Sequence, residues 1–220
     1  MLTIKDLTVK FPSRFGDFTA IKDVNMTIKP GEIHGLVGES GAGKSTVGAA
    51  VIGLLQAPGY VSSGTLTLGD TDLRRLTFAQ AHEIRGNRIS MIFQDPQTSL
   101  NPLMTIEDQL VETIQAHSDA SKTAARKRAV NLLEDIGIKN ASQRIKAYPH
   151  QFSGGMCQRV VIALAICTDP EMIIADEPTT ALDVAVQSQV LDLIQQLAKE
   201  RQIAFMLITQ IGRASCRERV

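Results

Sequence analysis

The sequence predicts an α/β fold built on a mostly parallel sheet. Four short apolar runs show no alternation of polar and apolar residues, which is typical of strands buried on both faces. These runs are Ile33–Val37, Ile89–Phe93, Met172–Ala175 and Ile203–Ile208. Helical patterns separate them, and strands that alternate with helices indicate a parallel sheet.

Five segments have the apolar spacing of helices. They are Thr46–Leu55, Thr105–His117, Ser121–Ile136, Met156–Cys167 and Val184–Glu200. Thr105 and Asp108 have the spacing of a capping box at the start of one helix. Gly137 stands where the end of another helix favours a left-handed residue.

Two regions depart from this alternation. Leu2–Ile28 and Val61–Leu73 contain short alternating stretches and turns, which predict a small antiparallel sheet beside the core. Residues from about 95 to 155 contain helix and loop signals. We therefore expect a single domain over residues 1–210, an α/β core with a small antiparallel β-subdomain and an inserted helical subdomain.

Composition narrows the function classes. The 220 residues include 23 Lys and Arg and 23 Asp and Glu, and zero net charge argues against a general nucleic-acid binder. The longest apolar run, Val160–Cys167, is too short to span a bilayer. The three cysteines do not form a disulfide framework or a metal site by spacing, and we interpret Cys157 and Cys167 as small helix residues. A soluble intracellular protein is expected.

The strongest motif is the segment Gly38–Ser45, which has the pattern G-x-x-x-x-G-K-[ST] between a strand and a helix. Its glycines let backbone N–H groups surround phosphate oxygens, and the following helix directs its positive end at the same anion. Lys44 can reach the β- and γ-phosphates, and the Ser45 hydroxyl can hold Mg²⁺. The predicted nucleotide contacts in this segment are Gly38, Ser40, Gly41, Ala42, Gly43, Lys44, Ser45 and Thr46.

A pair of carboxylates ends the apolar run at Met172–Ala175. Asp176 is placed to bind the shell of Mg²⁺. Glu177 is placed to orient or deprotonate an attacking water. An exposed acidic pair at a strand end is the plainer interpretation, but the preceding phosphate-binding loop favours the functional one.

A second candidate anion site lies at the start of an apolar helix. Ser153, Gly154 and Gly155 precede that helix, and small residues at a helix N-terminus can bind an anion. An ordinary N-cap followed by glycines would look the same. Two phosphate-binding elements in one chain are hard to explain unless two chains share a nucleotide.

Together these motifs resemble the nucleotide-binding subunit of ABC transporters, over residues 2–209. The matching segments are a Walker A loop at 38–45, a Q-loop at Gln94, a signature at 153–157, a Walker B strand at 172–177 and a D-loop at Asp183. Three stretches, at 93–102, 148–156 and 175–183, resemble the ATPases of bacterial dipeptide and oligopeptide importers. Nickel importers share that subfamily.

The resemblance implies two subunits that bind head to tail and enclose two ATP molecules with Mg²⁺. Ser153, Gly154, Gly155 and Met156 would then contact the nucleotide of the partner subunit, which is either an identical chain or a paralogue. Gln94 would contact Mg²⁺ or water, and Lys44, Gln94 and Glu177 would be the catalytic residues. Phe11 would stack on adenine, with Phe15 and Phe18 as alternatives.

The same resemblance implies a place in the cell and a set of partners. The chain would lie at the cytoplasmic face of the bacterial plasma membrane and bind transmembrane permease subunits. An extracytoplasmic solute-binding protein would act with it indirectly. The chain itself does not identify the cargo.

The end of the chain departs from the family. ABC ATPases have a histidine where this chain has Gln210, and that histidine normally contacts the γ-phosphate. We therefore predict slow hydrolysis or none by the chain as written. Residues 211–220 share no pattern with the rest and resemble translated read-through into a sequencing adapter, which predicts a non-native tail on a truncated domain. A real basic peptide is the alternative.

Three other functions compete with an importer ATPase. A soluble ABC ATPase that remodels ribosomes or DNA would commonly have tandem modules or a long coiled-coil insertion, and the sequence shows neither. A P-loop kinase would have no use for residues 153–155. An inactive ATP-binding remnant is the third. Co-purification with permeases would separate the importer from the first two.

Overall fold

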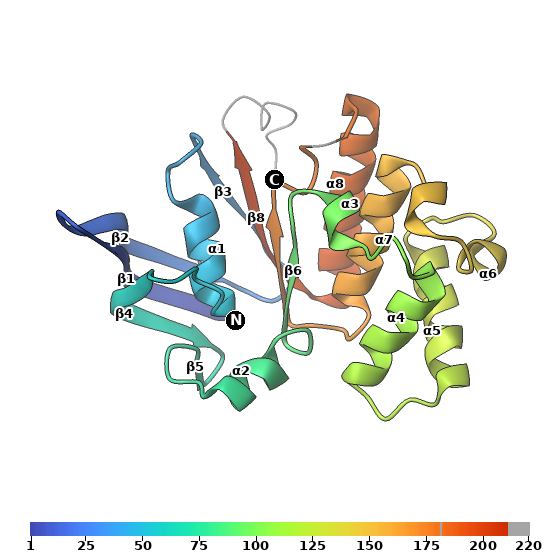
Figure 1. The fold of residues 1–220 in the computed structure, drawn as a ribbon, viewed down its shortest axis with the longest axis horizontal. Helices are drawn as coiled ribbons and strands as arrows, with labels where there is room; N and C mark the ends of the chain where they lie inside the picture. The colour runs from blue at the N-terminus through green and yellow to red at the C-terminus, as the bar shows by residue number, and fades with distance from the viewer. Residues whose placement is uncertain (181, 211–220) are drawn as a thin grey trace.

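The computed structural model describes residues 1–180 and 182–210. This part of the chain contains two sheets, with most helices beside the second (Figure 1). The first sheet is antiparallel, in the order β2-β1-β4-β5, and the second is parallel, in the order β3-β8-β7-β6. The predicted α/β fold is confirmed, including the antiparallel sheet beside the parallel one.

The strands have the following bounds. The antiparallel sheet contains β1 (Leu2–Ser13), β2 (Gly16–Ile28), β4 (Tyr60–Leu68) and β5 (Thr71–Asp72). The parallel sheet contains β3 (Ile33–Gly38), β6 (Ile89–Ile92), β7 (Met172–Asp176) and β8 (Ala204–Gln210).

Helix α1 (Lys44–Ile52) lies between the two sheets (Figure 1). Its buried residues share one apolar core with β1, β2 and β4 on one side and with the parallel strands on the other. A Cβ added at Gly48 would lie 3.0 Å from Ile174 Cγ2 and 3.1 Å from Ile208 Cδ1. A residue without a side chain therefore lets the helix approach the sheet closely.

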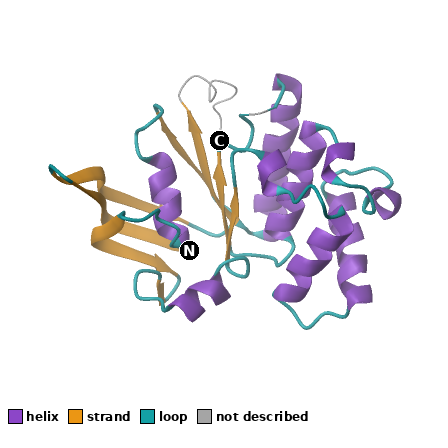
Figure 2. Cartoon of the chain, viewed as in Figure 1, coloured by secondary structure: helices purple, strands orange, loops and turns teal. Residues whose placement is uncertain are grey.

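The opposite face of the parallel sheet is covered by helices (Figure 2). Helices α7 (Gly154–Ile166) and α8 (Val184–Arg201) lie next to the sheet (Figure 1). The others pack against α7 or against one another: α3 (Pro96–Ser99), α4 (Ile106–Ala116), α5 (Lys122–Asp135), α6 (Ala141–Arg144) and a 3₁₀ helix at Pro149–Gln151. They form a second apolar core with that face of the sheet. The predicted boundaries of the helical subdomain, about 95–155, stay a prediction.

Strand β7 divides its side chains between the two cores. Met172 and Ile174 belong to the core around α1, whereas Ile173 and Ala175 belong to the core under α7 and α8. All four side chains are fully buried. The predicted burial on both faces is therefore confirmed for this strand.

The same prediction is wrong for β3. Its residues are half-buried or exposed, and Val37 is 49% exposed. Edge position alone is not the reason, because among the described strands β6 is at the other edge of the parallel sheet and is mostly buried. Strand β3 differs in its cover: Ile33 and Leu36 pack only partly against the two cores. An apolar run does not reveal how well its strand is covered.

Helix α2 (Phe78–Ile84) was not predicted. Thr77 caps it and forms a capping box with Gln80, a signal that the sequence contains. None of the residues of α2 is buried, so the helix has no apolar periodicity to detect.

Local signals set the ends of α4 and α5, although the capping box predicted at Thr105 and Asp108 forms only in part, because the Asp108 carboxylate accepts from the Thr105 hydroxyl at 2.6 Å. The Thr105 hydroxyl accepts a hydrogen bond from the Asp108 N–H at 3.1 Å, and Gly137 follows α5 with a φ of +82°. Helix α1 ends three residues earlier than predicted, because Gly53 is left-handed and closes the helix with its own N–H.

The cysteines of the described residues are structural. Cys157 and Cys167 are buried free thiols, and burial raises the pKa of Cys167 to about 12. A thiol with so high a pKa is a poor nucleophile at neutral pH. Cys216 and the predicted tail at 211–220 lie outside the described residues. In the described part of the chain, no helix is both long and apolar enough to cross a membrane.

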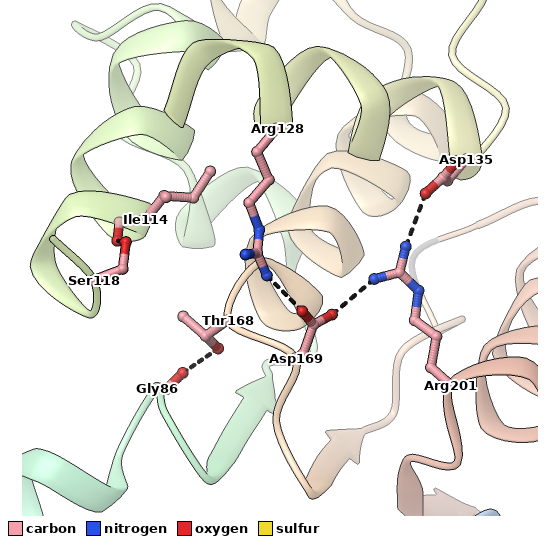
Figure 3. A network of polar contacts seen from close by, with 8 residues as sticks. All are labelled: Gly86, Ile114, Ser118, Arg128, Asp135, Thr168, Asp169 and Arg201. Atoms are coloured by element: carbon pink, nitrogen blue, oxygen red, sulfur yellow. Dashed lines mark hydrogen bonds and ion pairs between the residues drawn. The ribbon is translucent and has the colours of Figure 1, made fainter. Parts of the chain in front are cut away.

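An ion-pair network joins α5, the turn before β7 and the end of α8 (Figure 3). Asp169 accepts from Arg128 at 2.6 Å and from Arg201 at 2.9 Å, and Arg201 also reaches Asp135 at 2.8 Å. The Asp169 side chain is 60% exposed. Its attraction to the two arginines is therefore screened by water and salt.

We predict that Asp169→Asn destabilises the fold by less than about 1 kcal/mol at low salt. Asparagine tolerates the left-handed φ of +53° at this position, so the variant removes the charge and one of the two acceptor oxygens without adding backbone strain. The loss, measured by urea unfolding, should shrink in 1 M NaCl. Asp169→Ala should cost about 1 kcal/mol more through backbone strain. An equal loss at both salt concentrations would contradict the network's electrostatic role.

Candidate functional site

The glycine-rich loop between β3 and α1 has the backbone that an anion cradle needs. Gly41 and Gly43 both have a φ of +81°, a conformation that glycine adopts at no steric cost. A Cβ at Gly43 would also lie 2.5 Å from Ile21 Cγ2 and 2.8 Å from the Ala20 carbonyl oxygen. Strand β2 therefore packs directly against this loop, which fixes its curvature.

Lys44 places a positive charge inside the loop. The residue is only 8% exposed, and its Nζ donates to the carbonyl oxygens of Gly38 at 2.9 Å and Glu39 at 2.7 Å. These carbonyls satisfy the buried ammonium group. A phosphate oxygen in the loop would offer Nζ a stronger, charged acceptor.

Asp176, at the end of β7, meets the start of α1. The Ser45 hydroxyl donates to Asp176 Oδ1 at 3.1 Å, although 131 positions separate the two residues. Burial is the main cause that raises the pKa of Asp176, and the negative charge of Glu177 raises it further. The Ser45 hydrogen bond and the positive charge of Lys44 lower the same pKa. Hydroxyl and carboxylate oxygens are the ligands that Mg²⁺ prefers. Because these two oxygens lie close together, the residues fit the predicted metal.

Glu177 has a strained backbone and two hydrogen-bond donors on one oxygen. Its φ is +49°, which is costly for a residue with a side chain. The Gln94 amide nitrogen and the Thr180 hydroxyl each donate to Glu177 Oε2 at 2.9 Å. The structure thus brings together Gln94 and Glu177, two predicted catalytic residues. Sequence reasoning missed Thr180, because no motif assigns a role to a hydroxyl three residues after the glutamate.

The candidate signature lies at the N-terminus of α7. The Ser153 hydroxyl caps the helix by accepting from the Met156 N–H at 3.4 Å, and Gly154 is its first residue. A Cβ at Gly155 would lie 2.5 Å from Val186 Cγ1, so Gly155 has a packing role against α8. Asp183 is the N-cap residue of α8, without a side-chain cap hydrogen bond.

The signature and the glycine-rich loop lie on different faces of the parallel sheet. Helix α1 belongs to the core on one face, and α7 and α8 belong to the core on the other (Figure 1). The structure therefore does not gather these two predicted phosphate-binding elements into one core of the chain.

The three candidate adenine-stacking residues lie in and around the β1–β2 hairpin. Phe11 is half-buried, and a Cβ at Gly59 would lie 2.5 Å from its ring. Phe18 pairs with Phe11 across the two strands and is 66% exposed, and Phe15 is fully exposed. The assignment of Phe11 stays a prediction.

Comparison with known proteins identifies the family of this chain. The family model described as ABC transporter matches residues 21–180. The chain belongs to the ABC transporter family.

Among curated relatives, this ABC protein is 45% identical to the oligopeptide transport ATP-binding protein OppD of Escherichia coli over 209 residues, which are 95% of the chain and 62% of that protein. It is 43% identical to the dipeptide transport ATP-binding protein DppD of Escherichia coli, covering 95% of the chain and 64% of that protein. The chain thus spans less than two thirds of the length of these relatives.

A solved ABC structure has the same fold. The structure is a dimeric ATP-binding cassette in a post-hydrolysis state, bound to ADP and Pi, and its TM-score is 0.82 at 28% identity. The match covers 95% of this ABC protein and 88% of the solved chain. This agreement supports the fold of the whole described region.

We predict that Gly43→Ala destabilises the protein more than Gly41→Ala. Both positions have the same φ, so both variants incur about 1 kcal/mol of backbone strain. A methyl group at Gly41 meets nothing within 4 Å, whereas one at Gly43 meets β2. Urea unfolding without nucleotide should separate the two variants. Equal losses would contradict the close approach of β2.

We predict that Asp176→Asn stabilises the metal-free protein at neutral pH. Because burial raises the pKa of Asp176 above its usual 3.8, folded-state stability falls as pH rises through that interval. Asparagine is neutral throughout, so its advantage should be largest at pH 7 and vanish below pH 3.8. Thermal unfolding in EDTA across this pH range measures the difference. A variant less stable at pH 7 than at pH 4, relative to wild type, would contradict the burial argument.

Proposed function

We propose that the chain is the ATP-binding and ATP-hydrolysing subunit of an importer that carries peptides or a related small solute across the bacterial plasma membrane. One observation carries the proposal: the Ser45–Asp176 and Gln94–Glu177 hydrogen bonds gather a hydroxyl, two carboxylates and an amide beside the glycine-rich loop. The peptide branch is supported by the similarity to OppD and DppD, which are peptide-transport proteins by name.

Different residues of the site would bind the phosphates, the Mg²⁺ ion and the adenine ring of ATP. Backbone N–H groups of the loop 38–45 and the Lys44 ammonium group would hold the phosphates of ATP. Ser45, Asp176 and Gln94 would hold Mg²⁺, which neutralises charge on the phosphates. Phe11 would stack on adenine.

Hydrolysis would require little covalent chemistry from the protein. A water oxygen bonds to the γ-phosphorus, and the bond from that phosphorus to the bridging oxygen of ADP breaks, with its electron pair leaving on ADP. Glu177 accepts the proton of the water, and Gln94 helps to orient it. Lys44 stabilises the charge that develops on the departing phosphate.

A second subunit would complete each site. The separation of α7 from the glycine-rich loop supports this, because residues 153–156 can then contact the nucleotide of a partner. The solved cassette that shares this fold is itself dimeric. The partner would be an identical chain or a paralogue, Asp183 would lie near the shared nucleotide, and permease subunits would bind the pair from the membrane.

We predict that Glu177→Gln lowers ATP turnover by at least about 100-fold, as expected for loss of a general base, and leaves the Kd for ATP within twofold. Glu134→Gln, which removes the same charge from an exposed position on α5, is the matched control. Turnover that survives Glu177→Gln, or no ATP binding at all, would overturn the proposed function.

Because Gln210 replaces the family's histidine, Gln210→His should raise the slow ATP turnover of the chain.

A further inference from the structure

We propose that Thr180 is a positioning residue that holds the Glu177 carboxylate in place when the Gln94 amide turns from Glu177 to the nucleotide. The inference rests on the proposed function, because it concerns the geometry of the general base. Thr180 does not touch the nucleotide in this proposal and acts through Glu177 alone.

Two hydrogen bonds join Thr180 to Glu177. The Thr180 hydroxyl donates to Glu177 Oε2 at 2.9 Å, and the Thr180 N–H donates to the Glu177 carbonyl oxygen at 3.1 Å. One bond closes the backbone turn and the other fixes the side chain above it. Both hydrogen bonds that hold the Glu177 carboxylate to this turn therefore lie within four consecutive residues.

This turn is itself held from two sides. The Glu177 N–H donates to the Ile208 carbonyl oxygen of β8 at 2.9 Å. The Gln187 amide of α8 donates to the carbonyl oxygens of Thr179 at 3.0 Å and Leu182 at 2.9 Å. Because strand and helix hold its backbone, the turn can keep Glu177 at its strained φ of +49°.

The side chain of Gln94 can move more freely than that of Thr180. Gln94 lies in the loop between β6 and α3, and its side chain has three rotatable bonds before the amide. Thr180 is β-branched and has one stiff rotation before its hydroxyl. When the Gln94 amide turns to the nucleotide, as the proposed function requires, the Thr180 bond can stay with the Glu177 carboxylate.

The hydroxyl of Thr180 is thus expected to affect the rate and not the binding of ATP. Losing one hydrogen bond to a charged group should lower kcat about tenfold, while the KM for ATP stays within twofold. A purely structural role would instead lower the amount of folded protein, which reduces kcat in proportion and leaves the remaining molecules normal.

The test compares three variants of the full chain by hydrolysis of radiolabelled ATP under saturating Mg²⁺. Thr180→Val is isosteric and removes the hydroxyl, whereas Thr180→Ser keeps it. Thr179→Val is the matched control, because among the described residues the Thr179 hydroxyl makes no hydrogen bond to Glu177. We expect a tenfold loss of kcat for Thr180→Val alone, with thermal unfolding unchanged within a few degrees.

A crystallographic measurement separates this inference from the proposed function. With a non-hydrolysable ATP analogue bound, Glu177 should hold one side-chain conformation in wild type and Thr180→Ser, and more than one in Thr180→Val. A single unchanged conformation in Thr180→Val, or a kcat equal to wild type, would overturn the role of Thr180. Turnover of the Gln210→His chain no higher than that of Glu177→Gln would instead overturn the proposed function, and the crystal structures would still decide on Thr180.

Discussion

The close packing of α1 on the parallel sheet is the constraint on which the rest of the site depends. Gly48 lets the helix approach Ile174 and Ile208, and that approach brings Ser45 at the start of α1 within 3.1 Å of Asp176 at the end of β7. Packing in the apolar core thus determines the distance between the Ser45 hydroxyl and the Asp176 carboxylate. A methyl group at Gly48 would press on these two isoleucine side chains, which would have to shift by a few tenths of an ångström.

Buried charge gives this arrangement its chemistry. Lys44 is almost fully buried beside carbonyl oxygens, and burial raises the pKa of Asp176. Neither group is best stabilised without a ligand, since a phosphate would satisfy the ammonium group and a cation would satisfy the carboxylate. Holding these two charges away from water lowers the stability of the fold, which is the usual trade between stability and function.

Sequence reasoning predicted the elements that apolar pattern or motif specifies and missed those set by tertiary contact. Strand β7 was predicted with its burial because four consecutive apolar residues face two cores. Strand β3 has the same kind of run but packs only partly against the two cores, so its burial was predicted wrongly. Helix α2 has no buried face. Thr180 was missed because its role depends on how the turn after β7 folds back on Glu177, and no motif spacing states that.

The division of the chain into two cores also limits what one copy can do. Strand β7 sends alternate side chains to both cores and ends in Asp176 and Glu177, so the carboxylates lie at the boundary between them. The glycine-rich loop belongs to one side of this boundary and the Ser153 cap of α7 to the other. The two elements belong to cores on opposite faces of one copy, which fits the proposal that a nucleotide contacts them from two copies. The strand that ends beside the proposed general base therefore also agrees with the two-chain arrangement proposed for hydrolysis.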